Sequence, residues 1–485
     1  MKKLVLLLIA VCMVVTCFAC GGKDDKGWKD PFDKPNKEKW ADLPDHDFGG
    51  VDFRVSTRGG YANTEVLVAN EESEDIIDRA LMLRNARVED RYNIFVTCEE
   101  QPGTAFVHRD YVSESCKMNA DLFDLAMTYV YESSPLITNG MVYNWSKLPY
   151  THLAESHWIN GMNKQFSVRD AIYTAISKMC ISTISQTVAM FYNRQLGDEA
   201  FGGEEFTEGL FETIRGGDWT YDALMKIVNE YNWEDAGNDG RTPDDSYAFY
   251  MTADWSIDTW HAAWEIPMIK NTDKNGLEDV YMTDKVLTYA DRMHTMYYNT
   301  PNIYAAQQGD ARNAFKSNRA LFMTDQLGAT INSLADMENP YTILPQPKFD
   351  ENQKNYRSAM FDNYSVMSIP ISADPAFVSL IVEALSISSE DNVYPVYRVE
   401  ALQGLYLSDT DSYEMLDIVL NNVSWDIATL LNESLGETPL MTIVRFDVLN
   451  NPSDSQVSQA YNGAKNDIAD ALADIMEAFD TFQDN

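Results

Sequence analysis

The first twenty residues constrain this chain the most. Lys2 and Lys3 precede the uncharged residues 4–19, and Cys20 follows the small residue Ala19. A basic start, a short apolar core and a small residue before the junction are typical of exported proteins. The cysteine at the junction predicts a lipoprotein signal, in which Cys20 receives lipid and becomes the new N-terminus. The alternative is a signal whose cysteine is removed or left unmodified. Because no later apolar run reaches 18 residues, no other segment is expected to span a bilayer.

The chain is strongly acidic. Of its 485 residues, 37 are Lys or Arg and 75 are Asp or Glu, which gives a formal net charge of −38 at pH 7. Such a surface repels phosphate backbones, so nucleic-acid binding is excluded. With 45% hydrophobic and 12% aromatic residues, the chain can bury a large core, and its length predicts two or three domains.

Cysteine and histidine spacing gives no sign of zinc or of a disulfide framework. Cys98, Cys116 and Cys180 are expected to be buried small apolar residues, with one optional disulfide pair. The histidines form no metal-ligand spacing, and no GxSxG, HExxH or phosphate-binding glycine loop occurs. We therefore expect no metal, no cofactor and no catalytic residues.

Strands and helices alternate along the chain. Residues 20–47 are charged and contain proline, which is typical of a flexible tether. Strands are then predicted at 51–56, 93–97 and 123–130, with a helix from about Ser73 between the first two. Strand, helix, strand is the start of an α/β unit, in which loops at the carboxyl ends of strands form ligand clefts.

The α/β pattern continues in the later part of the chain. Strands are predicted at 184–193, 247–251 and 319–324, and a helix capped by Thr220 follows Gly217. The last helix is amphipathic, and its apolar face carries Ile468, Leu472, Ile475 and Phe479. The chain is therefore expected to form a mixed α/β body of more than one lobe.

Four segments carry a family resemblance. They are RNARVEDRYNIFV (84–96), AMFYNRQL (189–196), GGDWTYDAL (216–224) and YTILPQPKFDENQKNY (341–356). Their order resembles that in extracellular solute-binding protein family 1, the sugar-type binding proteins of ATP-driven (ABC) importers, in its larger lipoprotein branch. The resemblance covers most of 48–485, and it says nothing about the cargo.

The resemblance implies a two-lobed α/β fold of the periplasmic-binding-protein type II class, with a hinge that the chain crosses several times. It places lobe one at 48–184 and 358–405, lobe two at 185–357 and 406–485, and residues 360–364 at a crossing near the ligand. It also implies a lipid-anchored monomer on the extracellular face of the cytoplasmic membrane. Such a protein delivers a carbohydrate or oligosaccharide to the permease subunits of an ABC importer.

A sugar ring has apolar C–H faces and a rim of hydroxyl groups, so its site needs aromatic and planar polar side chains. Side chains of these kinds near the predicted strand ends and the crossing are the candidates for ligand binding: Arg58, Tyr61, Tyr129, Tyr131, Glu132, Asp254, Trp255, Trp260, Asp325, Gln326, Asp362, Asn363 and Tyr364. Each aromatic could instead pack in the core, which the four-residue spacing of Trp260 and Trp264 favours. Each carboxylate could instead lie in a solvated loop.

The acidic stretch 235–245 (DAGNDGRTPDD) has oxygen-bearing residues and glycine in an order that suits calcium. However, Gly237 occupies the third position, where Asp or Asn is expected, and no Glu stands at position twelve. A plain acidic turn is therefore the favoured interpretation.

Two other classes of function stay open at this point. A secreted glycoside hydrolase needs two carboxylates across a bond, which Asp254 with Asp325 or Asp362 could supply. A surface glycan-binding lipoprotein with a helical-repeat body is the second alternative, and the α/β alternation argues against it.

Overall fold

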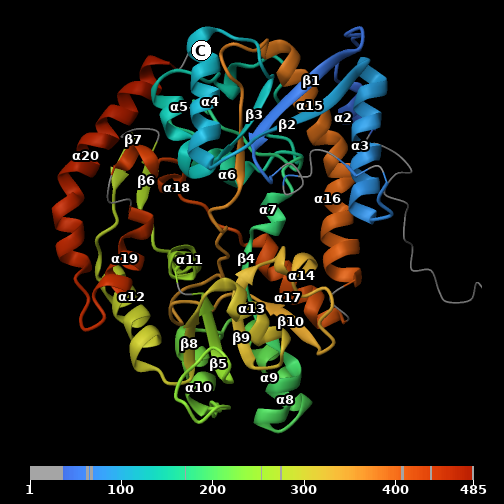
Figure 1. Ribbon diagram of the computed structural model, residues 1–485. Helices are drawn as coiled ribbons and strands as arrows, with labels where there is room; N and C mark the ends of the chain where they lie inside the picture. Colours follow the sequence, from blue (N-terminus) through green and yellow to red (C-terminus); the bar gives the residue numbers. More distant parts are fainter. Residues whose placement is uncertain are drawn as a thin grey trace, which may run out of the picture.

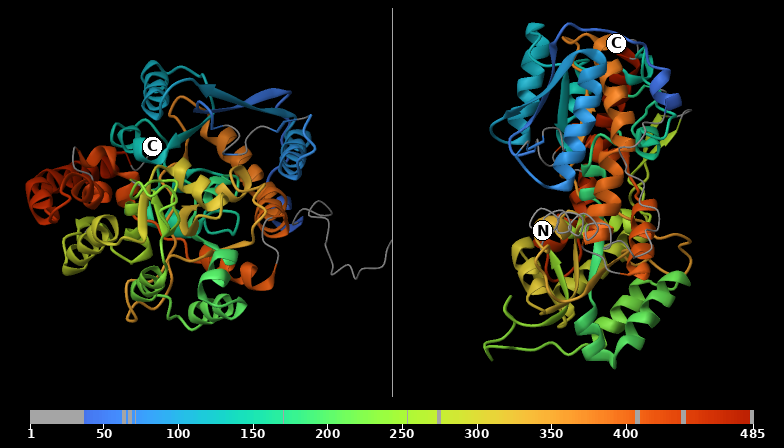
Figure 2. Two further views of the ribbon diagram at one scale, coloured as in Figure 1. Left: turned by 60° about the horizontal axis from the view of Figure 1, so that its bottom comes forward. Right: turned by 90° about the vertical axis from the view of Figure 1, so that its right-hand side faces the viewer.

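The computed structural model describes residues 37–61, 65, 69–70, 72–169, 171–252, 254–272, 276–405, 409–436 and 440–482. The predicted export signal and Cys20 lie outside the described residues. Two lobes, each built on its own β-sheet, are stacked one above the other in Figure 1. The side view in Figure 2 shows an elongated molecule with the lobes at opposite ends. Among the described helices, none is both long and apolar enough to cross a membrane.

Lobe one contains a four-stranded sheet in the order β11-β3-β1-β2. Strand β1 (Val51–Arg58) runs parallel to β2 (Ile94–Gln101) and β3 (Leu125–Tyr129), whereas β11 (Ser365–Ser368) is antiparallel to β3. The three strands predicted for this part of the chain are therefore confirmed. Because β1, β2 and β3 are parallel, their carboxyl ends meet at one edge of the sheet.

Lobe two contains a five-stranded sheet in the order β10-β4-β9-β5-β8. The strands are β4 (Val188–Asn193), β5 (Tyr247–Thr252), β8 (Ile303–Ala306), β9 (Ala320–Gln326) and β10 (Tyr341–Leu344). Every residue of β4 and β5 is buried, as expected for a sheet covered on both faces. The strand predicted from 184 begins later, because residues 182–185 form a short helix that leads into it.

Helices cover both sheets, and local signals account for several of their ends. The carboxylate of Asp75 accepts a hydrogen bond from the N–H of Ile77 at the start of α3, and the Thr220 hydroxyl accepts one from the N–H of Ala223 at the start of α10, as predicted. Helical elements in lobe one are α2 (Lys37–Ala41), α3 (Ile76–Tyr92), α4 (Ala105–Met118), η1 (Val130–Glu132), α5 (Ser134–Thr138), η2 (Trp145–Lys147), α6 (Asn160–Gln165) and α15 (Pro375–Asp391). Those in lobe two are α8 (Arg194–Phe201), α9 (Glu204–Arg215), α10 (Tyr221–Glu230), α11 (Ser256–Ala263), α12 (Asp284–His294), η3 (Thr295–Asn299), α13 (Gln308–Lys316), α14 (Ala329–Asn332) and α17 (Thr410–Asn421).

Three segments of the described chain run between the two lobes. The first passes through α7 (Ser182–Ser185), the second through residues 358–364, and the third through α16 (Val393–Pro395) and η4 (Val396–Leu405). The N–H of Val188 donates to the carbonyl of Ala359, so the first two segments lie side by side. Residues 360–364 therefore lead from the edge of the lobe-two sheet into β11 of lobe one.

The C-terminal elements contact both lobes. They are α18 (Ile427–Leu430), η5 (Glu433–Leu435), η6 (Leu440–Thr442), α19 (Ile443–Asn450) and α20 (Val457–Thr481), with the hairpin β6 (Ile269–Thr272) and β7 (Gly276–Asp279) beside them. Along one side of the molecule, α20 packs on α5 in lobe one and on α12 and β7. The predicted apolar face of α20 is buried, which confirms its amphipathic character. Because these elements touch both lobes, the residue borders of the lobes stay a prediction.

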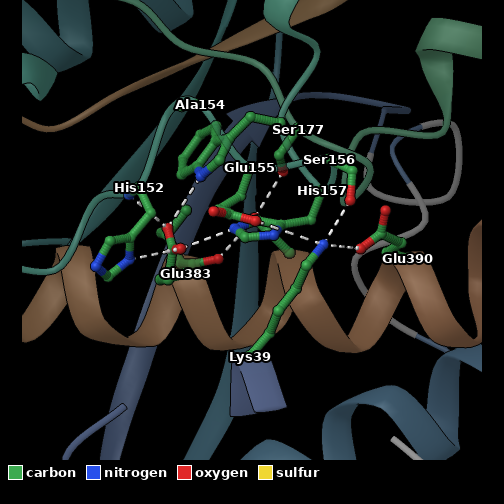
Figure 3. A network of polar contacts seen from close by, with 12 residues as sticks. Lys39, His152, Ala154, Glu155, Ser156, His157, Ser177, Glu383 and Glu390 are labelled. Atoms are coloured by element: carbon green, nitrogen blue, oxygen red, sulfur yellow. Dashed lines mark hydrogen bonds and ion pairs between the residues drawn. The ribbon is translucent and has the colours of Figure 1, made fainter. Parts of the chain in front are cut away.

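Residues 37–47, from the predicted tether, pack against lobe one. Leu43 is buried in the core, and the Arg91 guanidinium donates to its carbonyl and lies over the ring of Trp40. The ammonium group of Lys39 donates to Glu390 of α15 at 3.0 Å and to Ser156 (Figure 3). This part of the chain is therefore fixed to the α3 and α15 side of lobe one.

Candidate ligand site between the lobes

Side chains from both lobes meet around Asp362, in the second connecting segment. The hydroxyl of Tyr129 donates a hydrogen bond to the Asp362 carboxylate, and the charges of Arg58 and Arg445 act on the same carboxylate. We call the group that meets here the interlobe cluster: Arg58, Tyr61, Tyr129, Tyr131, Asp258, Asp362 and Arg445. It joins the carboxyl ends of the lobe-one strands to α11 and α19.

On the lobe-one side, Arg58 at the end of β1 organises two aromatic rings. Its guanidinium carbon lies 3.6 Å from the ring centre of Tyr61 and 4.4 Å from that of Tyr129. Its Nη2 donates to the carbonyl of Asn363 at 3.2 Å, and its buried Nε has no acceptor among the described residues. Burial lowers the pKa of Arg58 from its ordinary value, although nearby Tyr and Glu groups oppose this. The side chain thus keeps an unused donor inside the site.

On the lobe-two side, Arg445 and Asp258 form an ion pair. The Nη1 atom of Arg445 on α19 lies 3.2 Å from Oδ2 of Asp258 on α11. The other carboxylate oxygen of Asp258 and the Nε of Arg445 are buried without a partner among the described residues. This pair therefore offers one acceptor and one donor toward the cluster.

Burial and the local charges set the protonation of the cluster. Burial raises the pKa of Asp258 and of Asp362, and Arg445 opposes the rise at both. Burial likewise raises the pKa of Tyr131, and the charges of Asp362 and Asp258 raise it further, so its hydroxyl stays protonated. The cluster thus presents tyrosine hydroxyls, carboxyl groups and two guanidinium groups, a set that can both donate and accept hydrogen bonds.

Trp255 lies next to this cluster but is mainly packed. Its side chain is only 8% exposed and belongs to a small apolar group with Val188 and Ala359. Its ring centre is 4.5 Å from that of Phe361. The neighbouring Asp254 is exposed, and its charge acts on Asp362. Replacing Trp255 is therefore expected to affect both packing and the site.

Other candidates from the sequence are held elsewhere. Trp260 is fully buried in the core, which is the alternative that its spacing from Trp264 favoured. Asp325 is buried and paired with Arg312, Nε to Oδ2 at 2.5 Å. Gln326 interacts with the side chain of Gln308.

Glu132 and Tyr364 also lie apart from the cluster's contacts. Glu132 is paired with Arg109 at 2.7 Å, on the side that faces Glu433. Tyr364 is almost fully buried and lines a different cavity.

Conversely, sequence reasoning missed Asp258 and Arg445. Asp258 could have been found as the residue one helical turn after Asp254, whereas Arg445 carries no local signal.

The acidic loop brings three carboxylates together, those of Asp235, Asp239 and Asp245. Asp245 accepts hydrogen bonds from the N–H groups of Ala236 and Thr242, and Asp235 accepts from the N–H of Asp239. Burial would raise the pKa of Asp245, but these hydrogen bonds outweigh it and lower the pKa. The carboxylates therefore hold the loop's own backbone, as in an acidic turn. Within the part of the chain that the structure describes, Cys98, Cys116 and Cys180 are free thiols, so the optional disulfide pair is not formed among them.

Comparison with known proteins rests on structure alone. No family model matches the sequence, and no curated protein matches it. An ABC-transporter solute-binding protein from Thermotoga lettingae, solved with α-D-tagatose, matches with a TM-score of 0.56 and 13% identity over 87% of this chain and 100% of that chain. The maltose/maltodextrin-binding domain MalE from Bdellovibrio bacteriovorus, solved with maltotriose, matches with a TM-score of 0.57 and 10% identity over 86% of this chain and 100% of that chain. The galacto-N-biose/lacto-N-biose I-binding protein from Bifidobacterium longum has a TM-score of 0.55 and 11% identity over 88% and 98% of the two chains.

The chain has the two-lobed fold of the ABC-transporter solute-binding proteins. The mixed α/β, hinged architecture expected from the resemblance is confirmed. The two β-sheets exclude a helical-repeat body.

Proposed function

We propose that this protein is a solute-binding protein that captures a carbohydrate or oligosaccharide between its lobes. The observation that carries the proposal is the meeting of Arg58 and Tyr129 from lobe one with Arg445 and Asp258 around Asp362. A ligand held there contacts both lobes and the segment that joins them. The structures of the similar fold, solved with tagatose and maltotriose, support the choice of a sugar.

The chemistry of the cluster suits a polyhydroxylated ligand. Each sugar hydroxyl donates one hydrogen bond and accepts others, so it pairs well with neighbouring carboxylate and guanidinium groups. Tyr61 is partly exposed, and the ring face that Arg58 does not cover offers apolar surface to C–H groups. Closing the lobes around the ligand removes water from these contacts and is the whole mechanism.

The protein is proposed to bind its ligand without chemical change. Solved structures of similar fold are of binding proteins, which supports this choice over a glycoside hydrolase. We also propose that Cys20 carries lipid, that the protein is a monomer at the extracellular face of the cytoplasmic membrane, and that it delivers its ligand to the permease subunits of an ABC importer. Mass spectrometry of membrane-extracted protein should find diacylglycerol on Cys20 and lose it in Cys20→Ala.

Calorimetric titration with maltotriose, lacto-N-biose and tagatose tests the binding proposal. At least one sugar should bind the native protein, and Asp362→Asn should weaken that sugar by tenfold or more because the carboxylate loses acceptor strength. The exposed Asp470→Asn on α20 is the matched control and should bind as the native protein does. If no carbohydrate in a broader panel binds, or if Asp362→Asn binds normally, the site is not a sugar site. New reducing ends after incubation with maltotriose would identify a hydrolase.

A further inference from the structure

A second cavity of about 780 Å³ lies between the lobes, a volume within the range of small-molecule sites. Its lining combines Gly161 and Gln165 of lobe one with residues 261–262 and 265–271 of lobe two. Ala359, Met360 and Tyr364 complete it together with residues 423–426, and a bridge between Ser358 and Val423 joins these two segments. None of the residues of the interlobe cluster lines this cavity, so it is a separate feature of the hinge region.

Most polar groups of the lining are already used within the protein. The carboxylate of Asp426 accepts from the N–H groups of Met268 and Ala428, and Arg357 pairs with Glu265 at 2.8 Å. Such groups have little hydrogen-bonding capacity left for a ligand. The cavity therefore selects by shape and apolar contact rather than by the dense hydrogen bonding that a sugar needs.

The apolar part of the lining is aromatic and sulfur-rich. Trp425 is half-buried, and its Nε1 lies 2.8 Å from Sδ of Met360, so its one donor is engaged and its faces remain as apolar surface. Met268 and Met441 also line the cavity. Thioether side chains are flexible and make favourable contacts with aromatic rings. Lys270 is exposed at this lining and has no ion-pair partner among the described residues.

We propose that this cavity is a second ligand site, which takes an apolar aromatic molecule with an anionic group placed near Lys270. It goes beyond the carbohydrate site and does not depend on it. Both lobes line the cavity. A molecule bound there therefore stabilises the relative position of the two lobes that this structure shows. The bound molecule thus acts on the hinge that the first site also uses.

Fluorescence titration with 8-anilinonaphthalene-1-sulfonate, an aromatic sulfonate, tests the site. A Cβ added at Gly161 would lie 2.9 Å from the ring of Trp425, so Gly161→Leu fills the cavity or displaces that ring. Gly209→Leu is the matched control, because Gly209 is also an exposed helical glycine and a Cβ there meets nothing within 4 Å. The native protein and Gly209→Leu should show saturable binding at one site, and Gly161→Leu should bind at least tenfold more weakly.

Two charge-reversal variants provide a second test in case Gly161→Leu fails to fold. Lys270→Glu should weaken binding of the probe about tenfold, whereas Lys226→Glu, the same change at an exposed residue of α10, should leave binding unchanged. Equal binding in folded Gly161→Leu and the native protein, or equal effects of the two lysine changes, would overturn the proposal. Sugar calorimetry does not involve this cavity, so failure here and failure of the carbohydrate proposal can be told apart.

Discussion

The Nε2 atom of His157 lies 2.8 Å from Oε1 of Glu383, in the interior of lobe one. The same carboxylate takes a second imidazole, that of His152 with Nδ1 at 2.9 Å, and the indole Nε1 of Trp158 at 3.0 Å (Figure 3). A buried carboxylate is stable only when its lone pairs are filled, and here three side chains from one loop fill them. Glu383 on α15 is therefore the point that fixes the loop 152–158.

Glu383→Gln should destabilise the protein by about 3 kcal/mol, because the amide NH₂ group would face donors and leave one of them unpaired. Chemical unfolding followed by circular dichroism measures the change. The exposed Glu477→Gln on α20 is the control and should shift the unfolding free energy by less than about 0.5 kcal/mol. Equal stability of the two variants would show that the network is not needed for folding.

Trp255→Ala should lower the unfolding free energy by about 3 kcal/mol, because the ring is nearly buried against Phe361 and its neighbours. The sequence predicted Trp255 as a candidate ligand contact and left core packing open as the alternative. Phe95→Ala, at a ring that is 58% exposed on β2, provides the comparison and should cost well under half as much. Unchanged stability together with lost sugar affinity would instead make Trp255 a ligand contact.

Local patterns predicted much of the fold because their causes lie within a few residues. Short runs rich in apolar and β-branched residues predicted the strands of lobe one, and the Thr220 cap acts on an N–H only three residues away. The predicted strand from 184 was too long because apolar content does not distinguish α7 from the first residues of β4. Short apolar runs are ambiguous in this way.

The site could be predicted only in part, because its members come together through the tertiary fold. Arg58, Tyr129 and Asp362 were found since each follows a strand or lies at a crossing. Arg445 was missed because it lies on a helix near the C-terminus, where nothing local marks it as the partner of Asp258. Trp260 and Trp255 are both buried and differ only in how completely. The spacing of residues in the sequence does not reveal such a difference.

Glu132 should make stability depend on pH. Burial and the charge of Glu433 raise the pKa of Glu132 to about 7, although Arg109 opposes this. The unfolded chain releases the proton near pH 4.5 and the folded chain only near pH 7, so this group destabilises the fold progressively as the pH rises between these values. Below about pH 4.5 the effect is absent.

Glu132→Gln removes this titration. The stability of the variant relative to the native protein should therefore rise from pH 4.5 to pH 7 and stay level above, by on the order of 2–3 kcal/mol in total. Urea unfolding at several pH values measures it, with the exposed Glu208→Gln on α9 as the control. A difference that is flat across this range would show that Glu132 titrates at an ordinary pKa.

Ligand binding should bring the lobes together, because the interlobe cluster draws its groups from both of them. Small-angle scattering with a saturating sugar should give a smaller radius of gyration than without it. In a sugar titration, Asp362→Asn should need at least tenfold more sugar than the native protein to reach the same compact profile. An unchanged profile for the native protein at saturation would point to a rigid site on one lobe.

The Arg445–Asp258 pair should contribute to stability as well as to the site. Arg445→Met leaves a buried carboxylate without its cation, so we expect a loss of about 2–3 kcal/mol. Asp258→Asn should cost less, because burial already raises the pKa of this carboxyl and so favours its neutral form.

In a double-mutant cycle the two changes should couple by about 1–3 kcal/mol. The more exposed pair Arg398 and Asp417, at 2.8 Å, gives the comparison and should couple by less than about 1 kcal/mol. Coupling as weak as that of the exposed pair would mean that water, rather than Arg445, stabilises the charge of Asp258. The lobe-two half of the cluster would then lack the fixed ion pair on which its ligand contacts depend.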